Sequence, residues 1–326
     1  MSELVSLLSQ SFSGLWHLFV FPGGVFALAF GLFMKGCDRK LEARLQRRIG
    51  PPLVQPFYDI AKLFSKELII PEQASRKVFL AAPLIGFTGM AICAALVPVP
   101  GVYKGMSNMG DMLVLFYLLA LPAIGLLVAG SSSASPYGAL GLSREMTMMF
   151  AYEMPLLLTI LAVAMLVGGN AGPEFSLSRV VAYQAEYGQF GFSLIMLPAL
   201  VAYLIYLPGA IGTPPFDIAE AETEILEGPL LEYSGPALAF FQITAALKAV
   251  VVTGVGVVLF FPATITGGAV VNLLWFMVKC LLFYFFAVTL VKAATGRFRV
   301  EQALLFYMKV PGPLASVSLA LAWIFS

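Results

Sequence analysis

Six carboxylates lie within sixteen residues near the middle of the chain, in the stretch 211–235. They are Asp217, Glu220, Glu222, Glu224, Glu227 and Glu232. No lysine or arginine occurs between Arg179 and Lys248, so nothing nearby in the sequence neutralises them. Closely spaced like charges raise one another's pKa, and burial raises it further. Such a group of acids could exchange protons near neutral pH or bind cations.

The local pattern predicts a short helix over residues 218–227. A proline pair before Asp217 prevents the preceding helix from continuing. Asp217 then has the position of an N-cap, with Glu220 at capping-box spacing. At 100° per residue most of the acids form one stripe, and Glu222 alone lands on the apolar side.

Two interpretations of this acidic segment remain open on spacing alone. It is either a solvated acidic connector or a row of carboxylates that feeds protons or cations into a membrane domain. The flanking sequence bears on this choice because it is apolar on both sides.

Composition places the chain among polytopic membrane proteins. Of its 326 residues, 60% are apolar and 11% are charged, and the mean hydropathy is +0.91. Such values lie far outside the averages of soluble domains. The net charge of +1 gives no basis for nucleic-acid binding. We therefore expect an all-α, single membrane domain over residues 1–326.

Eight apolar segments are long enough to cross a bilayer, at about 20 residues per span. We expect spans near 14–34, 78–98, 112–130, 146–168, 190–210, 236–261, 268–291 and 303–325. Prolines inside several of them predict kinked or tilted helices.

The distribution of basic residues predicts the orientation. Ten of the 19 lysines and arginines lie between Lys35 and Lys77, in the loop after the first span. Loops with excess positive charge face the cytoplasm. The basic loop 35–77 and the acidic segment 211–235 are thus both expected on the cytoplasmic side of the membrane, with the N-terminus outside.

The basic loop also has helical periodicity. Leu41, Leu45 and Ile49 recur at helical spacing, and a second apolar stripe runs from Phe57 to Phe64. These patterns predict two amphipathic pieces that lie on the membrane surface or under a partner. Positive-inside bias with lipid headgroups as the only partners explains the loop equally well.

Three charged residues fall deep inside predicted spans. Glu153 is the clearest intramembrane acid, and a carboxylate there must be neutral, paired or facing a wet cavity. Lys248 and Lys279 lie about twelve residues inside their spans, roughly 18 Å at 1.5 Å per residue. Either lysine could pair with Glu153, or the lysines could form structural ion pairs between helices.

The three cysteines, Cys37, Cys93 and Cys280, are widely separated and have no metal-ligand spacing. We therefore expect no iron–sulfur cluster or other cofactor in this chain.

Three motifs resemble the quinone-site membrane subunit of respiratory complex I, which is subunit 1 of the mitochondrial enzyme and the H subunit of the bacterial one. Residues 215–235, PFDIAEAETEILEGPLLEYSG, match its P-F-D-x-x-E-A-E-x-E-L…G…E-Y-S-G pattern without a gap. Residues 151–155, AYEMP, are similar to its S-Y-E-[IV]-P. The first loop resembles its Q-x-R-x-G-P and L-Q-P-x-x-D-x-x-K-L-x-x-K-E patterns through Gln46, Arg48, Gly50, Pro51, Gln55, Pro56, Asp59, Lys62, Leu63, Lys66 and Glu67.

Departures from that pattern point to a particular branch of the family. Quinone-reducing members usually have an arginine where this chain has Thr213. They usually have an acid where this chain has Ala245, and this chain has Lys248 three residues after that position. The stretch GPPLVQP is more compact than in those members. SSSASPYGALGLSREM, before the fourth span, resembles the membrane subunit of energy-converting [NiFe] hydrogenases and formate hydrogenlyase.

The resemblance implies a subunit that lies under a hydrophilic redox arm and couples electron transfer to proton or sodium translocation. The expected partners are the hydrogenase large and small iron–sulfur subunits, antiporter-like membrane subunits and lipids, with the [NiFe] centre and clusters held by the partners. The expected ion pathway comprises Glu153, Asp217, Glu220, Glu222, Glu224, Glu227, Glu232, Lys248 and Lys279. The expected docking residues are Arg39, Lys40, Arg44, Arg47, Arg48, Gln55, Asp59, Lys62, Lys66 and Glu67. A quinone-site subunit, a subunit of a sulfur-reducing complex and a passive anchor remain alternatives.

Overall fold

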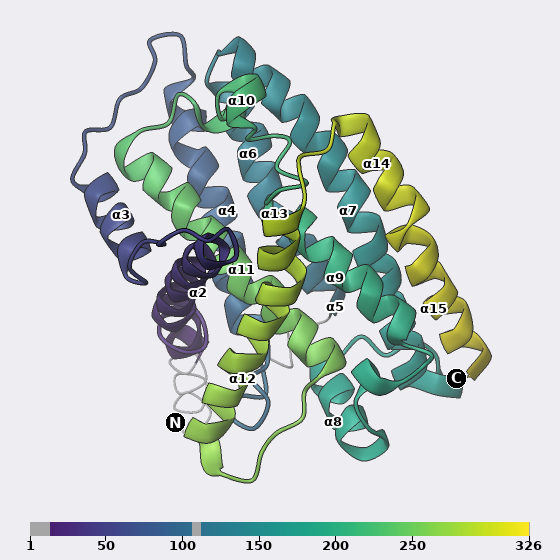
Figure 1. Cartoon of the computed structure of the whole chain (residues 1–326). Coiled ribbons are helices and arrows are strands. Elements are labelled where there is room, and N and C mark those ends of the chain that lie inside the picture. Colours follow the sequence, from purple (N-terminus) through teal and green to yellow (C-terminus); the bar gives the residue numbers. More distant parts are fainter. Residues whose placement is uncertain (1–13, 106–111, 326) are drawn as a thin grey trace, which may run out of the picture.

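The computed structural model describes residues 14–105 and 112–325, and within them the fold is all-α (Figure 1). The longer helices run side by side as a bundle, and short helices lie at its two ends (Figure 1). The elements are α2 (Gly24–Leu45), α3 (Gln55–Phe64), α4 (Arg76–Leu96), α5 (Met112–Leu119), α6 (Leu121–Ser132), α7 (Pro136–Gly168), η1 (Gly169–Ala171), α8 (Leu177–Tyr187), η2 (Phe190–Phe192), α9 (Leu197–Ile211), α10 (Glu222–Ile225), η3 (Gly228–Leu230), α11 (Gly235–Phe260), α12 (Gly268–Tyr284), the π-helix η4 (Phe285–Thr289), α13 (Leu290–Ala294), α14 (Val300–Lys309) and α15 (Pro311–Phe325).

Helix α11 is the centre of the bundle. It packs against α2, α4, α9 and α12, and α3 lies against it near its beginning. Its most apolar window is 94% buried, whereas the windows of the other long helices are half buried or less. A helix that is apolar on all sides belongs in an interior. A charged residue on α11 is therefore held inside the protein.

Seven helical segments of the described residues are long and apolar enough to cross a membrane. They correspond to seven of the eight predicted spans. The remaining one, expected at 190–210, is the shorter apolar helix α9. α9 returns the chain from the end where α7 finishes to the end where α11 begins (Figure 1). The prediction of an all-α polytopic membrane protein is confirmed.

Close helix contacts use glycine where backbones meet. At Gly31 of α2, an added Cβ would collide with the carbonyl of Ala246 in α11. Small residues at helix crossings allow such approach in membrane bundles. The α2–α11 contact places the end of α2 beside the acidic segment, because α11 begins where that segment ends.

The predicted helix over residues 218–227 is wrong. Only Glu222–Ile225 forms a helix, α10, and the chain turns at Leu226 and Glu227, which have φ angles of 51° and 68°. Asp217 consequently caps no helix. Residues 216–221 pack as a loop against α7, and Ile218 and Ala219 are buried there. Tertiary packing has overridden helix propensity at this place.

The first amphipathic piece was also predicted wrongly as a separate element. Leu41 and Leu45 belong to α2 itself, which continues beyond the predicted end of the first span, and Ile49 follows its end with 93% of its surface exposed. The second piece is α3, a short helix of its own with Phe57 and Phe64 exposed.

Candidate functional site

A cavity of about 260 Å³ lies between α2, α7, α11 and the loop 211–220. Its wall has both polar and apolar side chains. Four lining residues are basic and four are acidic: Lys35, Arg39, Lys248 and Lys292, with Asp38, Glu145, Asp217 and Glu220. The cavity therefore brings the acidic segment together with cations from distant parts of the chain.

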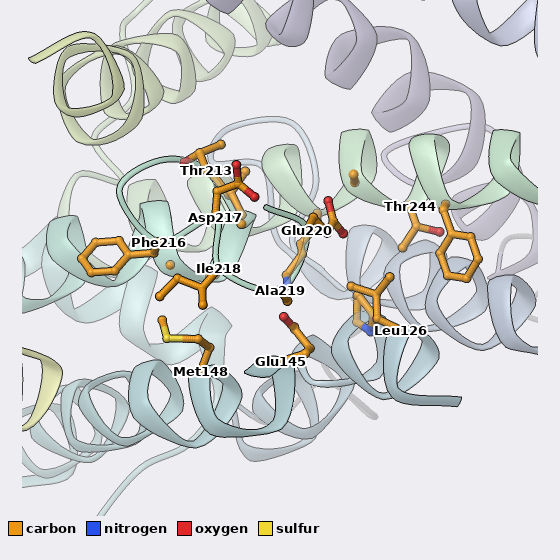
Figure 2. A pocket seen from close by; sticks show the side chains of 18 of the residues that line it. Leu126, Glu145, Met148, Thr213, Phe216, Asp217, Ile218, Ala219, Glu220 and Thr244 are labelled. Atoms are coloured by element: carbon orange, nitrogen blue, oxygen red, sulfur yellow. The ribbon is translucent and has the colours of Figure 1, made fainter. Parts of the chain in front are cut away.

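Helix α7 contributes Glu145, which the sequence pattern did not single out. The predicted span began at residue 146, but α7 begins at Pro136, with Ser135 before it. Proline in the first turn of a helix is a recognised start signal, and it would have placed Glu145 within the helix. In Figure 2 the Glu145 side chain points from α7 towards Ala219 of the acidic segment.

Glu220 is the acid of the segment that reaches into the cavity. Its side chain lies between the loop and the helix that carries Thr244 (Figure 2). The pKa of Glu220 is raised to about 7, first by burial and then by the carboxylates of Glu145 and Asp217, while Lys35 and Lys248 oppose this rise. A carboxyl with this pKa exchanges its proton at physiological pH.

Lys248 joins these groups electrostatically. It is 8% exposed on α11, and its ammonium lies 5.7 Å from the centre of the Tyr152 ring. It interacts with Glu145, Glu220 and Glu153. Glu153 was expected to pair with Lys248 or with Lys279. The structure supports Lys248 as the partner, through an electrostatic interaction at longer range than a direct ion pair.

Glu153 lies further along α7, eight residues beyond Glu145. That spacing corresponds to about 12 Å at 1.5 Å per residue. Glu153 interacts electrostatically with Lys248 and Glu145, and also with Tyr152 and Tyr206, whose buried rings have centroids 6.0 Å apart. The order Glu220, Glu145, Lys248, Glu153 thus leads from the acidic segment into the bundle.

Two acids of the segment have positive partners within this chain, contrary to the prediction that they lack them. Asp217 accepts a hydrogen bond from Arg297 at 2.7 Å, and Glu224 is paired with Arg144. Both arginines come from parts of the sequence far from the segment. Spacing along the chain could not reveal them.

The remaining predicted pathway residues lie away from the cavity lining. Glu227 is exposed at a turn, and Glu232 is half-buried. Glu222 begins α10, and its side chain is outside what the structure describes. Lys279 donates to the carbonyls of Phe261 and Ala263, at 2.7 and 2.5 Å, beyond the far end of α11. Its predicted pairing with Glu153 is therefore not found.

A second charged cluster borders the cavity and was also missed. Asp38 of α2 is 6% exposed and accepts a hydrogen bond from the Thr289 hydroxyl at 2.7 Å. Lys292 lies 3.5 Å from Asp38 and 2.6 Å from Glu42. Thr289 ends the π-helix η4, a type of element that often marks functional sites.

The predicted docking residues lie together, on the last part of α2, after its end, on α3 and just after α3. Arg39 of α2 binds Asp59 of α3 at 2.8 Å, and this ion pair joins the two helices. Gln55, also in α3, donates to the same carboxylate at 2.9 Å. Arg44 lies in the last turn of α2, and Arg47 and Arg48 follow it, all exposed. Lys40 is half-buried, whereas Lys62, Lys66 and Glu67 are exposed.

Within the described ranges, no three His, Cys, Asp or Glu side chains are grouped so that they could hold a metal ion. Cys37, Cys93 and Cys280 are free thiols. The charged side chains themselves are thus the chemistry that this site offers: proton exchange and ion binding.

Comparison with known proteins agrees with the motifs. The NADH dehydrogenase family model matches residues 19–323. The chain belongs to this family. The H subunit of NADH-quinone oxidoreductase from Rhizorhabdus wittichii is 32% identical over 88% of this chain and 84% of its own length. Its counterpart from Rubrobacter xylanophilus is 32% identical over 88% of this chain and 87% of its own length.

One solved structure shares the fold of this NADH dehydrogenase family member closely. It is a chain of the membrane-bound sulfane sulfur reductase, an archaeal respiratory membrane complex, with 30% identity and a TM-score of 0.81. The match covers 91% of this chain and 96% of the other. The expected likeness to the complex I membrane subunit is confirmed, and the chain is a multi-pass membrane protein.

Proposed function

We propose that this chain couples electron transfer in a docked hydrophilic arm to the translocation of protons or sodium ions across the membrane. The observation that carries the proposal is the cavity in which Glu145, Glu220 and Lys248 face one another. It connects the acidic segment at one end of the bundle with a buried lysine in its centre.

The coupling works through charge. Within the described part of the chain, no direct ion pair joins Glu145, Glu220, Glu153 and Lys248. Their charges therefore influence one another at longer range, and a change in one alters the proton affinity of the next. A redox event in the arm that shifts the loop 211–220 or its charge changes the protonation of Glu220, and Lys248 transmits this change to Glu153.

We propose further that the arm is of the energy-converting [NiFe] hydrogenase type and docks on exposed residues around the ends of α2 and α3 and on the acidic segment. Arg44, Arg47 and Arg48 form the exposed basic part of this surface. The motif around Ser143–Glu145 supports the hydrogenase type. A position inside the prokaryotic cytoplasmic membrane with the N-terminus outside follows from the basic loop.

A sulfur-reducing complex is the second candidate, because the sulfane sulfur reductase chain shares the fold over 91% of this chain. A quinone-reducing complex is the third, since the curated relatives bear that name. The polypeptides that purify with this chain decide among them: a large subunit with nickel ligands supports the hydrogenase type.

The coupling is tested in membrane vesicles that contain the assembled complex. Glu145→Gln, Lys248→Gln and Glu153→Gln are expected to reduce ion pumping per electron transferred, while the redox reaction with a soluble donor continues. Glu186→Gln, an exposed acid of α8 outside the acidic segment, is the matched control and should pump normally. Normal pumping by all three variants, each in an assembled complex, would show that the chain is a passive anchor.

A further inference from the structure

A second cavity lies between α2, α3 and the beginning of α11, and it shares Lys35, Arg39 and Gln242 with the first one. Its volume is also about 260 Å³. Its polar wall consists of Lys35 and Arg39 of α2, Lys62 of α3, Lys66 just after α3, and Gln242 of α11. Leu32, Ile60 and Leu63 supply an apolar wall.

This cavity has a strong excess of positive charge. It is lined by four basic residues and one carboxylate, that of Asp59. Arg39 already binds that carboxylate at 2.8 Å, so these two charges offset each other. The Lys35 ammonium donates to the carbonyl of Gln242 at 3.3 Å, and an ammonium has three donors. Lys35, Lys62 and Lys66 thus leave a cationic site that an anion complements.

The surroundings of the cavity indicate where this anion comes from. Helix α3 packs against α2 and against the beginning of α11 (Figure 1). Phe57, Tyr58 and Phe64 of α3 are exposed, and Phe64 contacts Phe240 of α11 edge-on at 5.9 Å. Exposed aromatic rings beside lysines, at the level where spans end, are typical of the boundary between headgroups and acyl chains.

We propose that this cavity binds the phosphate headgroup of an anionic phospholipid from the adjacent leaflet. Lys62 contacts the phosphate from α3, Lys66 contacts it from the turn just after α3, and Lys35 contacts it from α2. The acyl chains leave along the apolar wall formed by Leu32 and Leu63. Lys62 and Lys66 therefore have a lipid as their partner, in place of the docked arm that the family resemblance implied for them.

The size of the cavity agrees with this occupant. About 260 Å³ accommodates a phosphate with a small polar group attached, and it is smaller than the pockets of about 300–1,000 Å³ that enclose drug-sized ligands. The combination of an apolar wall with a cationic rim fits an amphiphile better than an acidic protein segment, which would leave the apolar wall uncovered.

The test uses the complete complex in lipid bilayers that contain spin-labelled phosphatidylglycerol or spin-labelled phosphatidylcholine. The wild-type complex is expected to immobilise phosphatidylglycerol preferentially. Each basic residue near a membrane surface strengthens binding of anionic lipid by roughly fivefold, so Lys62→Gln with Lys66→Gln should weaken this preference by about thirtyfold.

The control is Arg76→Gln with Lys77→Gln, which removes two positive charges from exposed positions at the start of α4, outside the cavity. It should leave the preference unchanged, and Lys62→Arg with Lys66→Arg should retain most of it. The proposal is overturned if the control pair weakens the preference as much as Lys62→Gln with Lys66→Gln does. An excess of inorganic phosphate that displaces the lipid signal would assign the site to free phosphate. Loss of the hydrophilic arm from the lysine variant, with lipid binding intact, would assign these residues to docking.

Discussion

The pKa of Glu220 reports on the charge coupling in the cavity between α2, α7 and α11. Burial and the neighbouring carboxylates raise it from 4.5 to about 7. A difference of about 2.5 units corresponds to roughly 3.4 kcal/mol, at 1.36 kcal/mol per unit. Because the Glu220 side chain is only partly buried, we take a free energy on the order of 3 kcal/mol as the upper limit of its effect on folding stability.

The sign of the pH dependence follows from linkage. The folded protein holds this proton more tightly than the unfolded chain does, because the folded pKa is the higher one. The contribution of Glu220 to stability is therefore fully present below pH 4.5 and is lost as the pH rises to about 7. Glu220→Gln should leave stability unchanged at pH 4 and increase it at pH 8 by as much as about 3 kcal/mol.

An infrared titration of the protonated carboxyl band, assigned by its loss in Glu220→Gln, measures the midpoint in the assembled complex. Removing a negative neighbour with Glu145→Gln should lower the midpoint by about one unit, and Lys248→Gln should raise it by a similar amount. Glu227→Gln, an exposed control, should not move it. A midpoint near 4.5 that is insensitive to Lys248→Gln would refute the reasoning.

Two further predictions concern the elements that hold the site. Arg297→Gln removes the ion pair of the Asp217 carboxylate, which is 14% exposed, so it should destabilise the fold by about 1–3 kcal/mol. Hydrogen exchange should then increase in residues 213–221, and unchanged exchange there would contradict this role. Gly31→Ala places a methyl group against a backbone carbonyl of α11. It should cost about 1–3 kcal/mol in thermal unfolding, whereas Gly296→Ala, which has open space around it, should be neutral.

The architecture was predictable because it depends on hydropathy, which a bilayer enforces. Every predicted span corresponds to a helix, since each must satisfy its backbone internally. The short α9 was predicted too long because its apolar sequence continues into η2 and a turn before Leu197. Local apolarity does not show where a buried backbone stops being helical.

The site was predictable in part. Glu153 and Lys248 were identified from their type and their depth in a span, and Glu220 was identified from its place in the acidic segment. Glu145 was missed because it lies at the apparent edge of a span, and only the start of α7 at Pro136 brings it inside.

The pairing of charges could not be predicted from spacing along the chain. Arg297 is 80 residues away from Asp217, and Lys292 is 254 away from Asp38. These contacts depend on how the last helices fold back onto the first ones. The helix predicted over residues 218–227 is absent for a related reason: the burial of Ile218 and Ala219 against α7 determines the backbone conformation there.

Helix α7 sets a fixed interval in the proposed ion pathway. Glu145 and Glu153 are carried on one continuous helix, so we expect their separation along it to stay the same as long as α7 remains helical. Any gate between them must therefore act from outside α7, through the position of the Lys248 side chain or the loop that carries Glu220. When structures determined in different redox states are superimposed on α7, we expect them to differ in the position of the Lys248 side chain or of the loop that carries Glu220.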